Sequence, residues 1–262
     1  MNVLITGAAN GLGLAASNYF ATNNHTVFAC DICKPKDKIN IKGYKLDVTN
    51  IEEINILKEE LIKKNIKIDV LINFAGIYDI GSFVEKDLNE IHKIMNINFM
   101  GPINVINILY PLLSKTGRII IVTSELAPLD PLPFNGLYSV SKTALDSYSQ
   151  SLRQELNLIG QKVITIRPGS FNTKLSRGSL DATEKLVNST KLYKKQSDNF
   201  LRLVQKFMGT PKDPMKLSKV IYKASTVKKP KYIYKCNINI GLKLLSILPL
   251  KLQCYIIKKL LK

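Results

Sequence analysis

Tyr138 and Lys142 are the side chains whose types and spacing most directly suggest chemistry. They lie four residues apart in a segment with helical periodicity, so both are expected on one face of a helix. A free tyrosine has a pKa near ~10, which is too high for acid–base work at neutral pH. A neighbouring ammonium favours the phenolate and lowers that pKa. The pair therefore predicts a group that donates and accepts protons, with Lys142 lowering the pKa of Tyr138.

A glycine-rich segment near the start of the chain predicts a dinucleotide site. Gly7, Gly11 and Gly13 come directly after an apolar run and open a segment with helical periodicity. Glycines at such a turn let backbone amides approach a phosphate, and the helix N-terminus adds partial positive charge. Together with Asn10 and Leu12, which lie between them, we expect these glycines to hold a pyrophosphate.

Asp31 indicates which dinucleotide is bound. It ends the second apolar run, about 20 residues beyond the glycines, where a carboxylate accepts hydrogen bonds from the adenosine ribose hydroxyls. Its charge repels a 2′-phosphate, and Asn10 supplies no positive charge to offset this. We therefore expect NAD as the cofactor, with NADP less favoured. Cys30 and Cys33 flank Asp31, but the chain has two histidines and four cysteines in all, and we expect no metal site.

Further candidate residues follow other apolar runs. Ser124 is expected to hold the substrate oxygen by a hydrogen bond, and Asn98 to bend a helix and hold a water in a proton relay. The remaining candidates are expected to line the cofactor: Asp47 and Val48 at the adenine, Asn73, Ala75 and Gly76 beside the ribose and nicotinamide, and Pro168, Gly169 and Thr173 at the carboxamide.

The elements that must position these residues alternate between short apolar runs and longer stretches of helical periodicity. Strands are predicted over 2–6, 26–30, 43–47, 69–73, 118–123, 163–167 and 232–234, and helices over 11–23, 51–64, 88–95, 103–113, 138–158 and 216–226. Continuous apolar strands that alternate with helices indicate an α/β fold, a doubly wound parallel sheet with helices on both faces. Ligands bind such sheets beyond the carboxyl ends of the strands, which is where the candidate residues fall.

Length and composition favour one globular α/β domain over residues 1–262. The hydrophobic fraction is 45% and the charged fraction 22%, as in chains that bury a core. The net charge of +18 comes from lysines spread along the chain with little arginine, so we expect a basic surface and no nucleic-acid site. The cysteines form no disulfide framework and no signal peptide is evident, which indicates the cytoplasm.

Two segments depart from the alternating pattern. Residues 174–215 are polar and partly helical, and we expect them to cover the substrate as an insertion. Their aromatic residues Tyr193, Phe200 and Phe207 suggest that the substrate is lipophilic. Residues 238–262 are apolar and basic and are interrupted at Pro249. Their lysines are compatible with a membrane surface, but we expect this tail to pack on protein instead.

These motifs together resemble those of the short-chain dehydrogenase/reductase family. The resemblance covers about the first 175 residues and rests on TGxxxGxG at 6–13, an NAG-type turn at 73–76, NxxG at 98–101, a serine at 124, YxxxK at 138–142 and PGxxxT at 168–173. It implies a Rossmann-type domain, an NAD(P) cofactor, hydride transfer between the nicotinamide and a secondary alcohol or ketone, and a homodimer or homotetramer. It also implies a catalytic tetrad of Asn98, Ser124, Tyr138 and Lys142.

The chain departs from the family pattern at two positions. Phe74 stands where the family usually has a second asparagine, which should change packing more than chemistry. Ser124 lies one residue further from Tyr138 than is usual, and Glu125 occupies the usual spacing. We assign Ser124 because it stands at the end of the predicted strand.

Two other functions remain open. A sugar-nucleotide epimerase or dehydratase also uses YxxxK. Enzymes of that kind have a GxxGxxG pattern at the glycine turn that holds the pyrophosphate, and this chain lacks that pattern. A regulatory protein that only senses a dinucleotide would keep the glycines without the chemistry, and the intact tetrad argues against it. Turnover of ketones with NADH separates a sensor from an enzyme.

Overall fold

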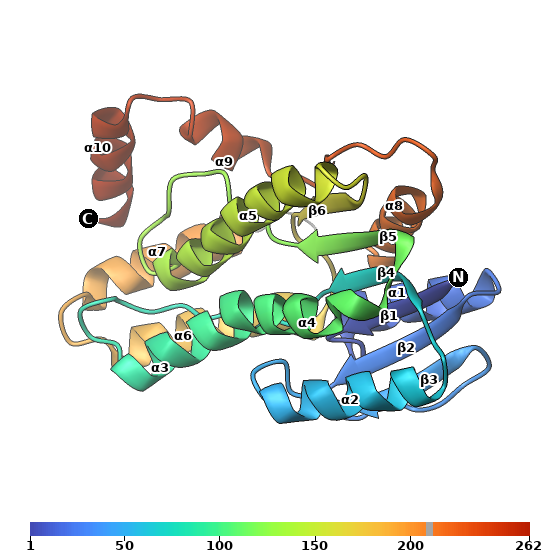
Figure 1. The fold of residues 1–262 in the computed structure, drawn as a ribbon. Helices are drawn as coiled ribbons and strands as arrows, with labels where there is room; N and C mark the ends of the chain where they lie inside the picture. Colours follow the sequence, from blue (N-terminus) through green and yellow to red (C-terminus); the bar gives the residue numbers. More distant parts are fainter. Residues whose placement is uncertain (208–211) are drawn as a thin grey trace.

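A parallel sheet forms the centre of the computed structural model (Figure 1), which describes residues 1–207 and 212–262 without the side chains of 174–177 and 207. Its seven strands follow the order β3-β2-β1-β4-β5-β6-β7. The strands are β1 (Asn2–Thr6), β2 (Thr26–Asp31), β3 (Ile41–Lys45), β4 (Ile68–Asn73), β5 (Leu113–Val122), β6 (Lys162–Pro168) and β7 (Ile233–Cys236). All of the paired strands are parallel, so the predicted doubly wound α/β fold is confirmed.

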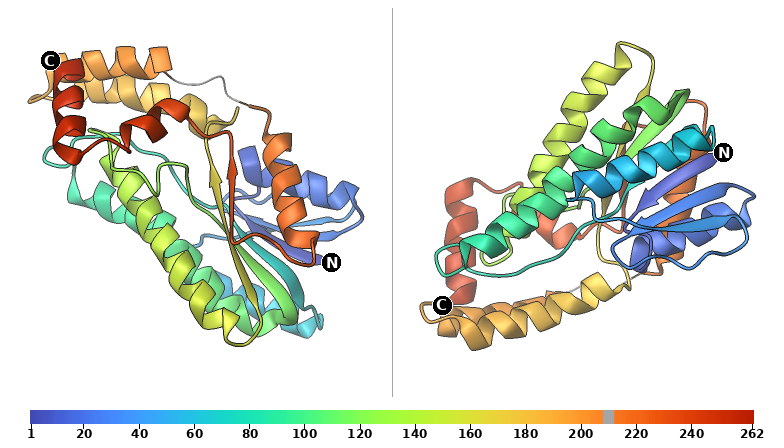
Figure 2. Two further views of the ribbon diagram at one scale, coloured as in Figure 1. Left: turned by 90° about the horizontal axis from the view of Figure 1, so that it is seen from above. Right: turned by 60° about the horizontal axis from the view of Figure 1, so that its bottom comes forward.

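Helices cover both faces of this sheet, as Figures 1 and 2 show. One face is packed by α1 (Gly11–Thr22) and α8 (Pro214–Thr226), which bury Phe20 and Ile221 against β1 and β6. The other face is packed by α2 (Ile51–Lys63), α4 (Gly101–Leu109) and α5 (Gly136–Asn157). The central strands β1, β2, β4, β5 and β6 therefore have apolar side chains on both of their faces, which explains the continuous apolar runs of the sequence.

The helix predicted over 103–113 is wrong at its end. Helix α4 stops at Leu109, a short 3-10 helix covers Tyr110–Leu112, and β5 already begins at Leu113. The register between β4 and β5 shifts between Ile68 and Val70, which are paired with Leu113 and Arg118. The polar residues 114–117 fall within this irregularity, so strand pairing extends across a segment without the apolar pattern that marks a strand.

Two helices, α6 (Lys174–Ser189) and α7 (Lys194–Phe207), occupy most of the expected insertion. The end of that insertion, at 208–211, lies outside the described residues. Figure 2 shows α6 and α7 side by side, apart from the sheet. Glu85 holds the turn between them, because its carboxylate accepts hydrogen bonds from Thr190 Oγ1 at 2.6 Å and from the amides of Lys191 and Leu192.

The last two helices are α9 (Ile240–Leu245) and α10 (Leu250–Leu261), at the top of Figure 1, whereas α3 (Leu88–Met95) lies at the lower left. Pro249 caps α10, at the interruption noted in the sequence. Helix α10 packs on α7 through Ile257 and Leu261, which join a cluster with Phe200 and Phe134. In the described part of the chain, no helix has the length and apolar character needed to span a bilayer.

Candidate active site

The glycine turn after β1 has the geometry of a phosphate cradle. Gly7 and Gly11 have φ values of +68° and +54°, a region that favours glycine. A Cβ on Gly13 would lie 2.1 Å from the carbonyl oxygen of Gly7, so only glycine fits this turn. Asn10 is the N-cap of α1, but its side chain makes no capping hydrogen bond, and no acidic residue lies in the first helical turn. The helix N-terminus is thus suited to an anion, and the residues present fit a dinucleotide.

Asp31 lies beside this cradle, as predicted. Its carboxylate accepts hydrogen bonds from the backbone amides of Ala9 at 3.0 Å and Cys33 at 3.1 Å. These contacts hold the carboxylate at the carboxyl end of β2, where an adenosine ribose binds in folds of this kind.

Asp47 and Val48 follow β3 in a loop, because that strand ends at Lys45, two residues earlier than the predicted end. The Asp47 carboxylate accepts hydrogen bonds from the backbone amide and the hydroxyl of Thr49. Val48 is buried, and a Cβ on Gly101 would lie 2.5 Å from its Cγ2. Both residues therefore have structural contacts of their own, independent of any adenine.

Residues after β4 bring the cofactor candidates close to the tetrad. A Cβ on Gly76 would lie 3.1 Å from Asn98 Oδ1 and 3.3 Å from Lys142 Nζ. The amide of Ala75 donates a hydrogen bond to Thr6 Oγ1 at 3.4 Å. The side chain of Asn73 is buried, and its polar atoms have no hydrogen-bond partner among the described residues.

Asn98 lies in a π-helical turn over Asn96–Met100, between α3 and α4. The predicted bend of a helix at this residue therefore takes the form of a π-turn, a feature common at functional sites. Its side chain is fully buried. Oδ1 accepts a hydrogen bond from the amide of Ile77 at 2.8 Å, and Nδ2 donates to the carbonyl of Ile77 and to Ser141 Oγ. In this way Asn98 fixes the backbone after β4 against α5.

Tyr138 and Ser124 meet at the carboxyl end of β5. Tyr138 lies in the first turn of α5 and is 8% exposed, and Ser124 follows β5 by two residues. The Ser124 hydroxyl lowers the pKa of Tyr138, so the two side chains lie beside each other. Lys142 lies one turn further along α5, is 5% exposed, and donates a hydrogen bond to the carbonyl of Val122 at 3.3 Å. Asn98, Ser124 and the Tyr138–Lys142 pair of α5, from three segments of the chain, thus lie at one end of the sheet.

Burial shifts the pKa values of both Tyr138 and Lys142. Burial raises the pKa of Tyr138 to about 12, the hydroxyl of Ser124 lowers it, and the charge of Glu125 raises it. Burial lowers the pKa of Lys142 to about 8. Burial outweighs the other causes for Tyr138, and the lowering of its pKa by the Lys142 ammonium stays a prediction. The cause of both shifts is desolvation, which disfavours the charged forms of both groups.

The segment after β6 reaches the cradle. A Cβ on Gly11 would lie 3.3 Å from Thr173 Cβ, so Thr173 stands against the dinucleotide turn. Pro168 ends β6, and a Cβ on Gly169 would lie 1.8 Å from the carbonyl oxygen of Asn237. Gly169 is therefore required by the close approach of the chain after β7, whatever else it contacts.

Three residues at the site were missed by the sequence analysis. The Tyr78 ring lies 4.7 Å from that of Tyr138, measured between centroids. Ser141 Oγ donates to the carbonyl of Tyr138 at 2.7 Å and links it to Asn98. The carboxylate of Glu125 accepts a hydrogen bond from the amide of Asn239 and so ties the start of α9 to the site. Ser141 lies between Tyr138 and Lys142 in the sequence, but no local pattern marks the other two.

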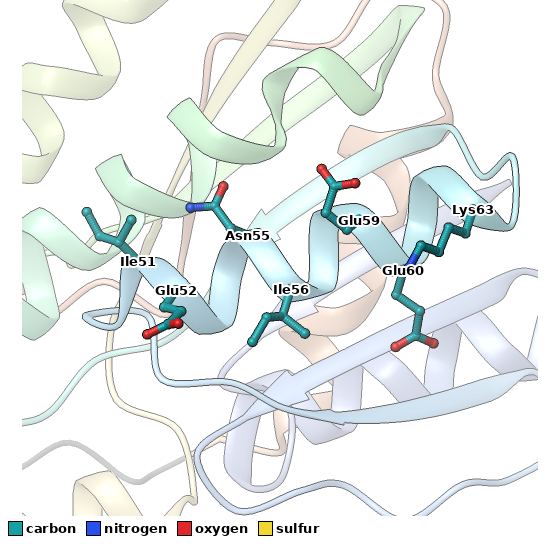
Figure 3. Close-up of a pocket in the computed structure, with 7 residues that line it drawn as sticks. All are labelled: Ile51, Glu52, Asn55, Ile56, Glu59, Glu60 and Lys63. Atoms are coloured by element: carbon teal, nitrogen blue, oxygen red, sulfur yellow. The ribbon is translucent and has the colours of Figure 1, made fainter.

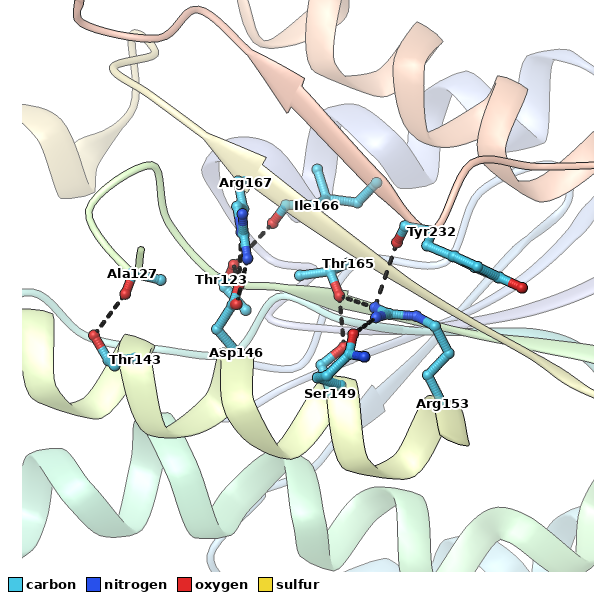
Figure 4. A network of polar contacts seen from close by, with 11 residues as sticks. Thr123, Ala127, Thr143, Asp146, Ser149, Arg153, Thr165, Ile166, Arg167 and Tyr232 are labelled. Carbon is cyan, nitrogen blue, oxygen red and sulfur yellow. Dashed lines mark hydrogen bonds and ion pairs between the residues drawn. The ribbon is translucent and has the colours of Figure 1, made fainter. Parts of the chain in front are cut away.

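Polar groups behind the site support α5 against the sheet (Figure 4). Asp146 accepts hydrogen bonds from Arg167 at 2.9 and 2.6 Å and from Thr123 Oγ1 at 3.0 Å. Arg153 donates to the carbonyl of Val163 and to Thr165 Oγ1. This network fixes α5, and with it Tyr138 and Lys142, relative to β5 and β6.

A hollow along α2 (Figure 3) contains none of the predicted site residues. Cys30 is buried and Cys33 is exposed, and both are free thiols. Within 1–207 and 212–262, no group of three His, Cys, Asp or Glu side chains is arranged to hold a metal ion.

Known proteins resemble this chain both in sequence and in structure. The family model described as short chain dehydrogenase matches residues 1–184. A 3-ketodihydrosphingosine reductase of Bacteroides thetaiotaomicron is 30% identical over 208 residues, which are 75% of this chain and 77% of that protein. A short chain dehydrogenase family protein of Francisella tularensis has a TM-score of 0.77 at 23% identity, with 93% of this chain and 98% of that chain covered.

A second solved structure bears on the cofactor. A short chain dehydrogenase of Burkholderia cenocepacia in complex with NADP has a TM-score of 0.74 at 22% identity, with 100% of this chain and 97% of that chain covered. A fold of this kind therefore accommodates NADP, and the expectation that NADP is less favoured than NAD is not supported. The family match over more than half of the chain, on a sheet of this topology, shows that the protein is an oxidoreductase of the short-chain dehydrogenase family.

Proposed function

We propose that this protein transfers a hydride between NAD(P) and a secondary alcohol or ketone, a reaction on CH–OH donors, with Tyr138 as the acid and base. The observation that carries this proposal is that buried Tyr138 lies beside Ser124, whose hydroxyl lowers the pKa of the phenol, at the same end of the sheet as the glycine cradle. A hydroxyl pair at that place can bind one substrate oxygen from two sides.

Each residue has a defined role in the proposed reduction. Ser124 holds the carbonyl oxygen, and Tyr138 donates a proton to it. A phenol with a pKa of about 12 carries its proton at neutral pH, which suits an acid. The nicotinamide of bound NAD(P)H supplies the hydride to the carbonyl carbon. Lys142, with a pKa of about 8, can return a proton towards Tyr138 near neutral pH, and Asn98 positions the backbone beside it.

The proposed cofactor site uses the residues predicted from the sequence. Gly7, Asn10, Gly11, Leu12 and Gly13 would hold the pyrophosphate through backbone amides. The other proposed contacts run along the strand ends: Asp31, Asp47 and Val48 for the adenosine, and Asn73, Ala75, Gly76, Tyr138, Lys142, Pro168, Gly169 and Thr173 for the nicotinamide half. We propose Asp31 as the residue that sets the ratio of NAD to NADP affinity, because its carboxylate would face the ribose hydroxyls.

A lipophilic substrate is supported by an apolar cluster that continues from the site. Tyr78 contacts Tyr138 and also belongs to a cluster with Phe134, Phe200 and Leu261. Helices α6, α7 and α10 supply much of that cluster, as expected of an insertion that covers the substrate. The Bacteroides relative is named for a long-chain ketone, and we take 3-ketodihydrosphingosine as the first substrate to assay.

The test measures turnover and binding separately. The wild type should oxidise NADH or NADPH when given 3-ketodihydrosphingosine or another long-chain ketone. Tyr138→Phe should lose at least about 100-fold in kcat, the lower range for general acid catalysis, while dinucleotide affinity by calorimetry stays within a few fold. Asp31→Ala should raise the affinity for NADP relative to NAD. Bound dinucleotide without turnover of any ketone in the wild type would show a sensor instead.

A further inference from the structure

One face of helix α10 packs on the protein, and an apolar strip beside it is partly exposed. Gln253, Ile257 and Leu261 recur every four residues and face the protein, with Gln253 and Leu261 buried. The strip of Leu252, Ile256 and Leu260 also recurs every four residues and therefore lies on another face. Leu252 is 42% exposed and Leu260 53%. Ile256, between them, is half-buried, so this strip is more exposed at its two ends than at its middle.

The preceding segment exposes large apolar side chains in the same way. Ile240, Leu244 and Ile247 are 71%, 61% and 69% exposed, respectively, at helical spacing through α9 and the turn that follows it. Leu250 and Tyr255 add to this surface. Single exposed apolar residues are common, but a run of them over two consecutive helices marks an interaction site.

Helices α9 and α10 carry charges of one sign, although the exposed carboxylate of Asp130 accepts a hydrogen bond from Gln253 at 2.9 Å beside them. No acidic residue occurs between 214 and 262, whereas lysines are interspersed with the apolar residues of α9 and α10 at Lys243, Lys251, Lys258, Lys259 and Lys262. Lys259 Nζ lies 5.8 Å from the centre of the Tyr255 ring, so its long stem lies along apolar surface. Lysines of this kind keep an ammonium at the level of a polar layer while apolar neighbours are buried below it.

We propose that the surface formed by α9 and α10 docks on an anionic lipid bilayer, with Leu252, Ile256 and Leu260 below the headgroups and the lysines among them. A second copy of the chain fits less well, because pairing these faces would bring the five lysines of one copy against those of the other, with Asp130 as the exposed carboxylate that contacts α10. Nucleic acid would match the charge but not the exposed leucines and isoleucines.

Docking of this surface would place the membrane beside the apolar cluster that leads to Tyr138. Ile257 and Leu261 of α10 pack in that cluster with Phe200, and Tyr78 joins it to Tyr138. A lipophilic ketone could then enter from the bilayer; this consequence, unlike the docking itself, rests on the proposed function.

Co-sedimentation of the full chain with vesicles tests the docking without any activity. Wild-type protein should sediment with phosphatidylcholine vesicles that contain phosphatidylglycerol, and much less with phosphatidylcholine alone. Lys251→Gln/Lys258→Gln should lower the partition coefficient roughly 30-fold at low salt, about fivefold per lysine. Leu252→Ser/Leu260→Ser should lower it roughly tenfold. The matched control Ile56→Ser/Ile62→Ser changes two exposed isoleucines of α2 and should leave it unchanged.

Fluorescence locates the contact, because the chain has no tryptophan. The emission of Leu252→Trp should shift to the blue when anionic vesicles are added, whereas that of Ile56→Trp should not. Failure of the wild type to sediment with the anionic vesicles, or equal sedimentation of all variants, would overturn the proposal. Sedimentation velocity without lipid provides a second test. If the wild type is a dimer and the Leu252→Ser/Leu260→Ser variant is a monomer, this surface binds a second copy of the chain and the proposal is overturned.

Discussion

Replacing Lys142 by methionine should make the protein more stable at neutral pH while removing its activity. Burial lowers the pKa of Lys142 from 10.5 to about 8, so the folded protein binds this proton less well than the unfolded chain does. That difference corresponds to about 3 kcal/mol of destabilisation below pH 8. Methionine is unbranched and carries no charge to desolvate. The substitution removes the hydrogen bond from Lys142 to the Val122 carbonyl, which costs about 1 kcal/mol. The free energy of unfolding at pH 7 should therefore rise by about 2 kcal/mol in total.

The pH dependence of this gain identifies its cause. The unfolded chain binds more protons than the folded one between pH 8 and 10.5, so wild-type stability from this group rises with pH across that window. The advantage of Lys142→Met should therefore shrink above pH 8 and nearly vanish by about pH 10. Urea unfolding of both proteins at several pH values measures it.

An exposed lysine provides the control for this experiment. Lys63→Met, on the surface of α2, should change stability by less than about 0.5 kcal/mol at every pH. The reasoning would be refuted if Lys142→Met were no more stable than the wild type at pH 7, or if its advantage were the same at pH 7 and pH 10. We expect a stabilised but inactive variant, because the catalytic site requires the Lys142 side chain whereas the fold does not require it.

Three further perturbations test other parts of the structure. Glu125→Gln removes a negative charge that raises the pKa of Tyr138, so the basic limb of the pH profile for ketone reduction should move to lower pH; a shift to higher pH would contradict this. Gly13→Ala places a Cβ 2.1 Å from the Gly7 carbonyl oxygen. It should lower the free energy of unfolding in urea by about 2 kcal/mol or more and weaken dinucleotide binding. The control Gly178→Ala, whose Cβ would have nothing within 4 Å, should have neither effect. Asp146→Asn breaks the ion pair of 2.6 Å with Arg167, in which both side chains are about 15% exposed or less. The free energy of unfolding in urea should fall by about 3 kcal/mol. A fall of less than about 1 kcal/mol would mean that α5 does not depend on this pair.

Sequence alone determined the architecture, and it supplied the residues of the candidate site as predictions. The strands of a parallel sheet are apolar on both faces, so their runs can be read locally, and the glycines of the turn after β1 precede a helix that begins at Gly11 as expected. Some candidate residues, such as Ser124 and Gly76, were predicted because they follow strand ends, whereas Tyr138 and Lys142 were predicted from their spacing on a helix. Boundaries failed where pairing overrode pattern, as in the early start of β5 at Leu113.

Only the tertiary structure decided the electrostatics of the site and the residues that surround it. The raised pKa of Tyr138 and the lowered pKa of Lys142 both come from burial, and burial depends on the elements that cover α5 and not on the spacing within it. Tyr78, Glu125 and Asn239 meet at the site from separate segments, and α10 divides into a packed strip and a partly exposed one only once α7 lies against it. A residue's type and local spacing are written in the sequence, whereas desolvation and long-range contact arise only when distant segments exclude water together.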